Sequence, residues 1–321
     1  MLSKFKYSVL LIVCIVLYIF PDINISAAET TSGTFGNGVS WSISGNTMTI
    51  SGTGEMGDVK YQPYSAYSST ITEIVINEGV SSVGEGAFSN FSSLKKVQLP
   101  QTLKLIDVNA FSYCYNLAYI DIPDSVSYIG NKAFYGAYFL AKITDEYIVL
   151  GDGVLYEYKG SDSEIVIPDG VKTISDRIFV SNTNIKSVYI PDSVKTIGSG
   201  AFLGCSNLEY AIIPKNVDFI GDNSFGYILN PAPAVYSGFT MYGFYSTEAQ
   251  VYAEKNDINF CLMGDADGDG QLSSYDALNV LQYSTLISEP DSSQKILSDM
   301  DMDSSLTSYD ALLILQSAVG L

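Results

Sequence analysis

Four carboxylates lie close together in the stretch GDADGDGQLSSYDALNVLQ at 264–282. Numbered from Asp265, aspartates occupy positions 1, 3, 5 and 12 of a twelve-residue segment, and a glycine that permits a sharp turn stands at position 6. Alternate carboxylates can surround a hard cation with oxygen, and without a cation they would repel one another. The spacing is typical of a calcium loop. Its expected ligands are Asp265, Asp267, Asp269, the backbone carbonyl of Gln271, and Asp276.

A second copy of this loop follows 34 residues later. Its expected ligands are Asp299, Asp301, Asp303, the backbone carbonyl of Ser305, and Asp310. Ser304 replaces the turn glycine, which we expect to cost about 1 kcal/mol if the residue needs a positive φ, so that the second site is weaker or adjusted. A solvated acidic turn is the alternative for either loop alone. Two loops, each followed by a matching helical segment, favour two bound calcium ions.

The segments after the loops, SSYDALNVLQ and TSYDALLILQ, have the apolar spacing of helices. Leucines recur at i and i+3 in both segments, and we expect them to share one face and to pack together. They are Leu278, Leu281, Leu312 and Leu315. These apolar residues argue against a merely solvated tail, although residues 264–321 hold ten acidic residues and one lysine.

The composition of the whole chain excludes several kinds of function. The 321 residues carry a net charge of −19 and contain no histidine. Without histidine there is no Ser-His-Asp or Cys-His catalysis and no His-ligated zinc. The acidic charge argues against nucleic acid and against anionic membranes as partners, because phosphate contacts need Lys and Arg.

The first 28 residues have the pattern of a secretory signal peptide. Lys4 and Lys6 precede an apolar run of 14 residues from Tyr7 to Phe20, and small residues at 26–28 supply a cleavage site. The run is short for a membrane span, so an uncleaved anchor is the less favoured alternative. We therefore expect a secreted, extracellular protein with no membrane segment after cleavage of the signal.

The central region repeats with a period of 23 residues. Segments such as VSYIGNKAF and VKTIGSGAF end at Phe88, Phe111, Phe134, Phe179, Phe202 and Phe225, with intervals of 23, 23, 45, 23 and 23 residues. Short strand signals that end in proline, such as LAYIDIP, follow most of these phenylalanines. A single unit cannot bury its apolar side alone, so the pattern predicts a solenoid of stacked units.

Three cysteines remain beyond the signal segment, at 114, 205 and 261, and an odd number gives no complete disulfide framework. Cys114 and Cys205 each stand three residues after a repeat phenylalanine. Because their positions in the repeat are equivalent, we expect both to be small, buried, apolar residues.

The repeat pattern LxxIxIPxSVxxIGxxAFxxCxxL resembles leucine-rich repeats of the BspA type over about 71–230. The β-rich segment at 40–58 and the segment at 239–260 are similar to the usual beginning and the usual strand-helix-strand ending of such repeats. The resemblance implies a binding or adhesion module for an unidentified protein or glycan. It also implies that the side chains on the open strand face of the repeats point away from the core. The residues at these positions are Lys96, Gln98, Tyr119, Asp121, Ser187, Tyr189, Tyr210 and Ile212. Our candidates for ligand contact are Tyr119, Tyr189 and Tyr210.

The two loop-helix halves at 264–321 resemble a type I dockerin, with Asp rather than Glu at position 12 of each loop. The resemblance implies docking onto a cohesin domain of a scaffoldin, as in cellulosomes. The recognition positions of the family are loop positions 10 and 11, which here are Ser274-Tyr275 and Ser308-Tyr309. Leu278 and Leu312 complete the predicted partner-binding set.

Together these observations predict an α+β protein with four parts. They are a signal peptide at 1–28, a β-rich N-terminal cap at 29–70, a leucine-rich-repeat solenoid with its C-terminal cap at 71–262, and a small all-α dockerin at 263–321. We expect a non-catalytic, secreted cellulosome-type component, held at the cell surface through a scaffoldin and serving polysaccharide catabolism.

Two alternatives remain open. The first is a polysaccharide-degrading enzyme subunit, since many dockerin proteins are glycoside hydrolases. Such chemistry needs two carboxylates held across a cleft, whereas the acidic residues of the repeats lie mostly in turn segments. The second alternative is a free cell-surface adhesin, for which the dockerin would be secondary.

Overall fold

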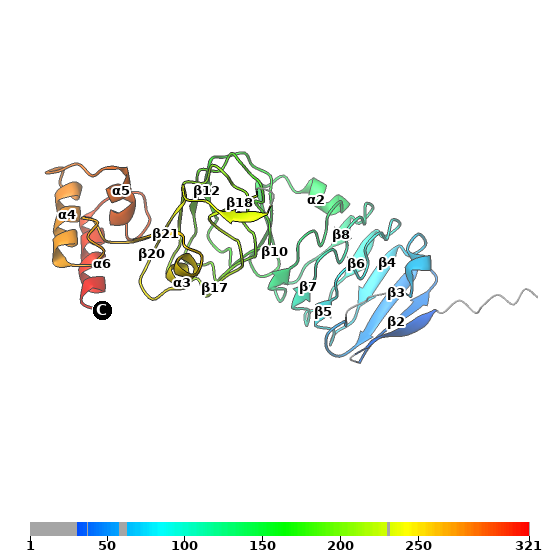
Figure 1. The fold of residues 1–321 in the computed structure, drawn as a ribbon. Helices are drawn as coiled ribbons and strands as arrows, with labels where there is room; N and C mark the ends of the chain where they lie inside the picture. The colour runs from blue at the N-terminus through cyan, green and yellow to red at the C-terminus, as the bar shows by residue number, and fades with distance from the viewer. Residues whose placement is uncertain (1–30, 37, 58–62, 230–231, 321) are drawn as a thin grey trace, which may run out of the picture.

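The computed structural model describes residues 31–36, 38–57, 63–229 and 232–320. The predicted signal peptide at 1–28 lies outside these residues. The molecule is elongated, with an antiparallel sheet at one end and three helices at the other (Figure 1). Within the described part of the chain, no helix combines the length and the apolar character needed to cross a membrane.

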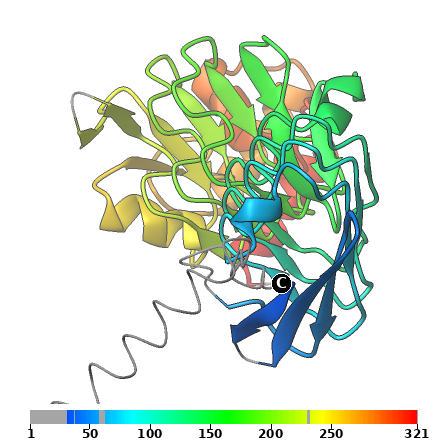
Figure 2. The same cartoon turned by 90° about the vertical axis from the view of Figure 1, so that its right-hand side faces the viewer.

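An antiparallel meander closes the N-terminal end of the solenoid. It consists of β1 (Ser32–Gly36), β2 (Val39–Ser44) and β3 (Thr47–Gly52), and the short 3-10 helix η1 (Ser65–Tyr67) follows. The third strand then pairs in parallel with the first strand of the repeats. The meander is therefore continuous with one sheet of the solenoid, and it faces the viewer in Figure 2.

The first repeats place one short strand on each of two parallel sheets. One sheet continues the meander with β4 (Glu73–Ile76), β6 (Lys96–Gln98) and β8 (Tyr119–Ile120). The other contains β5 (Ser82–Val83), β7 (Leu105–Ile106) and β9 (Tyr128–Ile129). Partners in both sheets are 23 residues apart, as in the pair Ser82 and Leu105. This register confirms the predicted solenoid.

The 45-residue interval interrupts the repeats. It contains the short helix α2 (Tyr138–Lys142) and an antiparallel hairpin of β10 (Tyr147–Leu150) and β11 (Val154–Tyr158). The sheet that continues the N-terminal meander ends at β8, and a separate sheet begins at β12 (Glu164–Val166). Strand β11 pairs in parallel with β13 (Thr173–Ile174), which leads into the second set of repeats.

The second set of repeats again has two parallel sheets. One continues from β13 with β15 (Thr196–Ile197) and β17 (Phe219–Ile220). The other continues from β12 with β14 (Ser187–Tyr189), β16 (Tyr210–Ile212), β20 (Thr240–Gly243) and β21 (Asn259–Leu262). The helix α3 (Glu248–Lys255) lies between the last two strands, so the predicted strand-helix-strand ending is confirmed.

The segment that departs from the repeat after Phe225 forms a separate hairpin. Its strands are β18 (Tyr227–Leu229) and β19 (Pro233–Val235), which pair only with each other. The hairpin projects from the side of the coils in Figure 2.

The repeat phenylalanines stack in two columns inside the solenoid. Neighbouring rings lie 4.7–5.6 Å apart within the columns Phe88–Phe111–Phe134 and Phe179–Phe202–Phe225. Two tyrosines of β11 stand between the columns. Tyr156 contacts Phe134 at 5.7 Å, and Tyr158 contacts Phe179 at 5.2 Å. The inserted hairpin therefore joins two hydrophobic cores that the 45-residue interval would otherwise separate.

The coils approach one another closely at the glycine of each IG pair. A Cβ at Gly130 would clash with the backbone of Val108, and one at Gly198 would clash with the backbone of Asp176. Glycine is therefore required there for close stacking. Two residues before each stacked phenylalanine, the backbone is left-handed; φ is 56° at Lys132 and 57° at Arg177.

Cys114 and Cys205 are buried free thiols, as predicted. The Sγ of Cys114 donates to the carbonyl of Phe88, and the Sγ of Cys205 donates to the carbonyl of Phe179, both at 3.1 Å. Burial raises the pKa of each thiol to about 12. These two cysteines thus hold neighbouring coils together as weak donors rather than through a disulfide.

The C-terminal segment forms three helices, α4 (Ser274–Ser284), α5 (Ser292–Ser298) and α6 (Ser308–Ala318). Helices α4 and α6 pack against each other in a core that includes Ala277, Val280, Ala311 and Ile314. The prediction that the four leucines pack together is wrong. Leu278 and Leu312 are 47% exposed, and Leu281 and Leu315 are 38% exposed. Each leucine follows a buried residue, and one residue turns a helix by about 100°, which moves the leucines off the packed face.

Candidate functional site

The first acidic loop gathers three of its predicted ligands. One carboxylate oxygen from each of Asp265, Asp267 and Asp269 lies within 4.8 Å of the others. The carboxylate of Asp265 accepts backbone N–H groups from Gly268, Asp269 and Gly270 at 2.8–3.1 Å. The backbone is therefore wound around this carboxylate, and the φ of 83° at Gly270 makes the turn possible.

Asp276 closes the first loop from the start of α4. It is fully buried, and its carboxylate accepts the N–H of Asp267 at 3.2 Å and that of Ser273 at 2.8 Å. The Ser273 hydroxyl in turn accepts the N–H of Tyr275, so Ser273 and Asp276 form a capping box. Gln271 lies in the same loop, where its N–H donates to Asp269 at 2.8 Å.

The second loop also gathers three of its predicted ligands, but the set includes the position-12 aspartate in place of the position-5 aspartate. One oxygen from each of Asp299, Asp301 and Asp310 lies within 4.8 Å of the others. Asp310 is fully buried and accepts the N–H groups of Met300 and Thr307, both at 2.8 Å. The other two predicted ligands are in hydrogen-bond contact with each other, since the N–H of Ser305 donates to the carboxylate of Asp303 at 2.8 Å.

The turn residue of the second loop adopts the conformation that its glycine counterpart predicts. The φ of Ser304 is 68°, a left-handed value that residues other than glycine adopt at a cost in conformational free energy. Met302 also has a positive φ of 58°, at the position of Gly268 in the first loop. This second strained position was not predicted, although Gly268 at the equivalent place was a signal for it.

The charges of the two loops are incompletely balanced by protein groups. Burial and the neighbouring carboxylates of Asp310, Asp301 and Asp303 raise the pKa of Asp299 to about 6. Burial is also the main cause that raises the pKa of Asp267 and of Asp301. The three ion pairs of the described residues lie elsewhere, at Lys96–Glu73, Lys172–Asp152 and Lys255–Asp222.

The donor set fits a calcium ion. Buried carboxylates such as Asp276 and Asp310 are stable when they are paired or coordinate a metal, and no cationic side chain of the described residues pairs with either. The gathered ligands are hard oxygen atoms, which Ca²⁺ prefers over softer metals. Each loop thus has the chemistry to hold one divalent cation.

The predicted recognition residues begin the two equivalent helices. Ser274 and Tyr275 are the first residues of α4, and Ser308 and Tyr309 are the first residues of α6. Tyr275 is 59% exposed and Tyr309 is 53% exposed. Together with the exposed leucines at 278, 281, 312 and 315, they form two apolar surfaces of the same composition, which we call the docking surfaces.

Three exposed apolar residues near the ends of these helices were not predicted from the sequence. They are Leu286 and Ile287 after α4, and Val319 after α6. Exposed apolar groups of this size are typical of interaction sites.

The helical module packs against the end of the solenoid (Figure 1). Ile212 and Tyr242 of the solenoid share one buried cluster with Met263, Ala266 and the core of α4 and α6. Tyr245, beyond β20, donates its hydroxyl proton to the backbone carbonyl of Gly270. The first acidic loop is therefore tied directly to the solenoid.

The structure separates the three predicted ligand-contact tyrosines. Tyr119 lies on β8 and is exposed. Tyr189 and Tyr210 lie on β14 and β16, in the sheet that begins at β12. Both are only partly exposed and pack against the cluster that joins the solenoid and the helical module. Their hydroxyls are 3.3 Å apart. The three tyrosines do not form one surface.

Two other residues of the open strand face depart from the prediction. Ser187 and Ile212 were expected to point away from the core, and both are buried. Ile212 is buried because the helical module covers it. Lys96, Gln98, Tyr119 and Asp121 are exposed, as predicted.

Family models match both parts of the chain. A model described as BspA type leucine rich repeat region matches in six copies at 60–149 and 142–230. A model described as dockerin type I domain matches at 263–317. No curated protein matches the chain.

Several solved structures are similar to parts of the chain. A leucine-rich repeat protein from Eubacterium ventriosum is 23% identical, with a TM-score of 0.28, covering 67% of this chain and 72% of its own. One from Bacteroides ovatus is 23% identical, with a TM-score of 0.29 and coverage of 65% and 55%. A leucine rich cell surface protein from Faecalibacterium prausnitzii is 20% identical, with a TM-score of 0.28 and coverage of 74% and 95%.

The repeat model covers more than half of the chain, and the structure has the stacked coils and the pair of loop-helix halves that the two models describe. The protein therefore belongs to the BspA-type leucine-rich-repeat family and carries a type I dockerin domain at 263–317.

Proposed function

We propose that the protein is a non-catalytic, secreted component that a cohesin domain of a scaffoldin holds through the dockerin, while the repeats bind a protein or a glycan. BspA-type repeats and dockerins are typical of extracellular or surface proteins, and neither is a catalytic domain. The proposal places the protein in a cellulosome-type assembly that acts on polysaccharides.

We assign one role to each predicted segment of the chain. The signal peptide at 1–28 directs export, the cap at 29–70 and the repeats at 71–262 form the binding module, and the dockerin occupies 263–321. The contact between Tyr245 and Gly270 supports a fixed arrangement of the last two parts.

In this proposal each dockerin loop binds one Ca²⁺. The ligands are the predicted sets that begin at Asp265 and at Asp299, each with one backbone carbonyl. The ion would neutralise the gathered carboxylates and lock each loop against the helix that follows. The two fully buried carboxylates of Asp276 and Asp310 support the assignment, because burial of an unpaired charge is costly.

The duplicated docking surface is the observation that carries the proposal. Two Ser-Tyr pairs begin two equivalent helices, each directly after an acidic loop, and both tyrosines are more than half exposed. A hydroxyl next to a large amphipathic ring suits the centre of a protein interface. Either half could therefore present the same surface to a cohesin.

A pull-down of the full chain with a panel of cohesin domains tests this function. We expect capture by at least one cohesin in calcium and loss of capture in excess chelator. A matched variant with Asp276→Asn and Asp310→Asn should lose capture even in calcium. If neither the chelator nor the double substitution reduces capture by a cohesin, the proposal is contradicted.

The free adhesin remains a second candidate, which the exposed tyrosines Tyr113, Tyr115, Tyr119, Tyr135 and Tyr138 of the first repeats favour. Cell fractionation separates the two functions. Attachment through a scaffoldin predicts release of the protein from the cell surface by a chelator, whereas an adhesin bound through its repeats would stay attached.

A further inference from the structure

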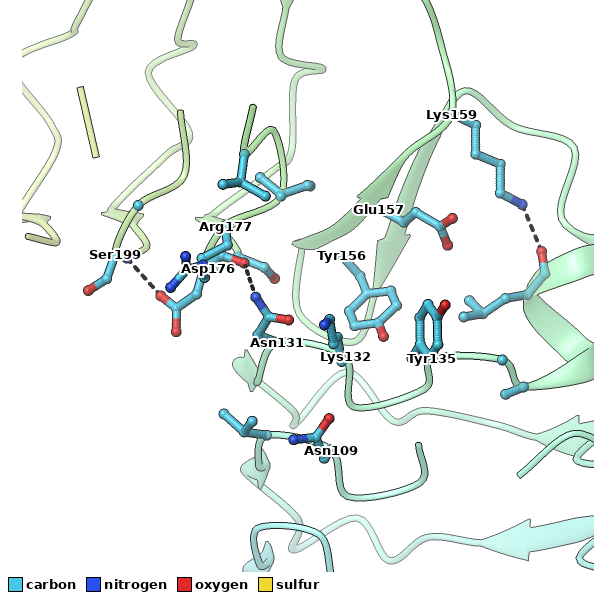
Figure 3. Close-up of a pocket in the computed structure, with 18 of the residues that line it drawn as sticks. Asn109, Asn131, Lys132, Tyr135, Tyr156, Glu157, Lys159, Asp176, Arg177 and Ser199 are labelled. Atoms are coloured by element: carbon cyan, nitrogen blue, oxygen red, sulfur yellow. Dashed lines mark hydrogen bonds between the residues drawn. The ribbon is translucent and has the colours of Figure 1, made fainter. Parts of the chain in front are cut away.

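A groove opens where the repeats are interrupted (Figure 3). Its volume is about 1340 Å³. On one side lie Asp176 and the left-handed corner at Arg177. On the other side lie the left-handed corner at Lys132, Tyr135 at the end of the third coil, and the hairpin strand β11 with Glu157. We call it the seam groove, because it follows the junction between the two sets of repeats.

Exposed tyrosines gather at the seam groove. Tyr115, Tyr135 and Tyr138 line it, and each is more than half exposed. Tyr113 extends the group, with its ring 5.9 Å from that of Tyr115 and 5.4 Å from that of Tyr135. Four exposed tyrosines at one groove, three of them with their rings in contact, are unusual for a surface without a ligand, since each exposes a large apolar area.

Several polar groups in the groove are available for a ligand. Among the described residues, the carboxylate of Glu157 and the guanidinium of Arg177 make no ion pair or side-chain hydrogen bond. The ammonium group of Lys132 lies 5.8 Å from the ring centre of Tyr135 and likewise has no acidic partner there.

Other polar groups of the groove are already satisfied and serve as its frame. The carboxylate of Asp176 accepts the Tyr128 hydroxyl at 3.0 Å and the Ser199 N–H at 2.7 Å. The ammonium group of Lys159 donates to the carbonyls of Leu140 and Ile143, both at 2.8 Å. These contacts fix the two walls of the groove, so its shape does not depend on a ligand.

We propose that the seam groove binds a segment of a neutral polysaccharide. A pyranose ring has an apolar C–H face that stacks on aromatic rings and a rim of hydroxyls that both donate and accept hydrogen bonds. The groove offers both features, with tyrosine rings beside the unpaired Glu157, Arg177 and Lys132. The proposal deepens the binding role of the repeats and rests on it, but it does not depend on the dockerin.

Size and charge select among ligand classes. The volume exceeds the roughly 300–1,000 Å³ of common small-molecule sites, which favours an extended chain over a single ring. The three cations Lys132, Lys159 and Arg177 are matched in number by Glu157, Asp176 and Asp222 in the same lining, so there is no positive field for a polyanion.

Affinity electrophoresis and calorimetry of the full chain in calcium test the proposal. The probes are the neutral polysaccharides β-glucan, xylan, xyloglucan and galactomannan, with polygalacturonate as the anionic comparison. We expect at least one neutral probe to bind. Tyr135→Ala and Tyr138→Ala should each weaken that binding about tenfold or more, and Arg177→Ala several-fold.

The matched control is the double variant Tyr275→Ala and Tyr309→Ala, which removes a similarly exposed tyrosine from each docking surface and should weaken cohesin capture. It should leave glycan binding unchanged, and Tyr135→Ala should leave cohesin capture unchanged. This pair of variants separates failure of the glycan site from failure of the docking function. Circular dichroism of each variant checks folding, and Tyr138→Ala or Arg177→Ala replaces Tyr135→Ala if that variant is unfolded.

Three outcomes would overturn the proposal. They are the absence of binding to every neutral probe, neutral binding that the groove variants do not weaken, and binding to polygalacturonate alone. A peptide array is run in parallel as a further test. Binding of peptides in the groove, without binding of the neutral glycans, would also contradict the proposal.

Discussion

The hydroxyl of Tyr242 in the solenoid lies 3.2 Å from the hydroxyl of Ser293 in the dockerin. Tyr242 also contacts the ring of Tyr210 at 5.8 Å, and both belong to the apolar cluster that includes the packed faces of α4 and α6. The dockerin therefore shares part of its core with the last repeats. Its docking surfaces are nevertheless exposed, because the contact uses other residues of the module.

Removal of calcium should unfold the dockerin and leave the solenoid folded. The gathered carboxylates repel one another without a cation, whereas the repeats contain no comparable acidic loop among the described residues. Circular dichroism should show loss of helix and retention of sheet in excess chelator. Exposure of Ile212 and Tyr242 should also increase the binding of a hydrophobic dye. Unchanged helicity and unchanged cohesin capture under chelation would contradict the assignment of both calcium sites.

Each half of the dockerin should support docking by itself. Replacement of Ser274-Tyr275 by alanines should leave cohesin binding largely intact, and so should replacement of Ser308-Tyr309, because the other exposed pair remains available. Replacement of both pairs should abolish binding. Titration calorimetry with one cohesin measures the three variants. A large loss from either single-half variant would argue against two interchangeable docking modes.

Ser304→Gly should strengthen the second calcium loop. The φ of 68° at Ser304 favours glycine, so the substitution should stabilise the loop by about 1 kcal/mol. Gly270→Ala is the matched reverse change, because φ is 83° there and an added Cβ would meet no atom within 4 Å. It should weaken the first loop by a similar amount through backbone strain alone. Calcium titrations monitored by circular dichroism measure both effects. Equal calcium affinity in Ser304→Gly and in the parent protein would contradict the claim that backbone strain at Ser304 weakens the second loop.

Cys114 and Cys205 should resist thiol reagents in the folded protein. Burial raises the pKa of both thiols from 9.0 to about 12, so neither the thiolate nor an access path is present at pH 8. Labelling in denaturant should modify both. Rapid labelling of either cysteine in the native protein at pH 8 would show that the coils open there.

The same thiols predict a loss of stability in alkali. Because their pKa values are raised in the folded state, their contribution is fully present below about pH 9 and is lost as the pH rises toward about 12. The double variant Cys114→Ala and Cys205→Ala should show a weaker dependence of the unfolding temperature on pH in this range. An equal dependence in the parent and in the variant would assign the alkaline loss to other groups.

The periodic and local features of this protein could be predicted from its sequence. A 23-residue spacing brings equivalent residues of neighbouring coils together, so the Phe88–Phe111 contact and the burial of Cys114 follow from the period. The acidic loops are contained within twelve residues each, so the gathering of Asp265 and Asp267 follows from local chain geometry. The positive φ of Ser304 follows in the same way from its glycine counterpart.

Contacts between segments that are distant in the sequence could be decided only by the tertiary structure. Two apolar faces compete on each dockerin helix, and the packing of α4 on α6 buries Val280 and leaves Leu278 exposed. The sequence by itself determined the repeat, the interval of 45 residues and the two acidic loops. Only the folded chain decided that the dockerin covers Ile212 and that the interval opens a groove between Lys132 and Arg177. Neither outcome has a local signal, because each depends on how completed coils and helices pack against one another.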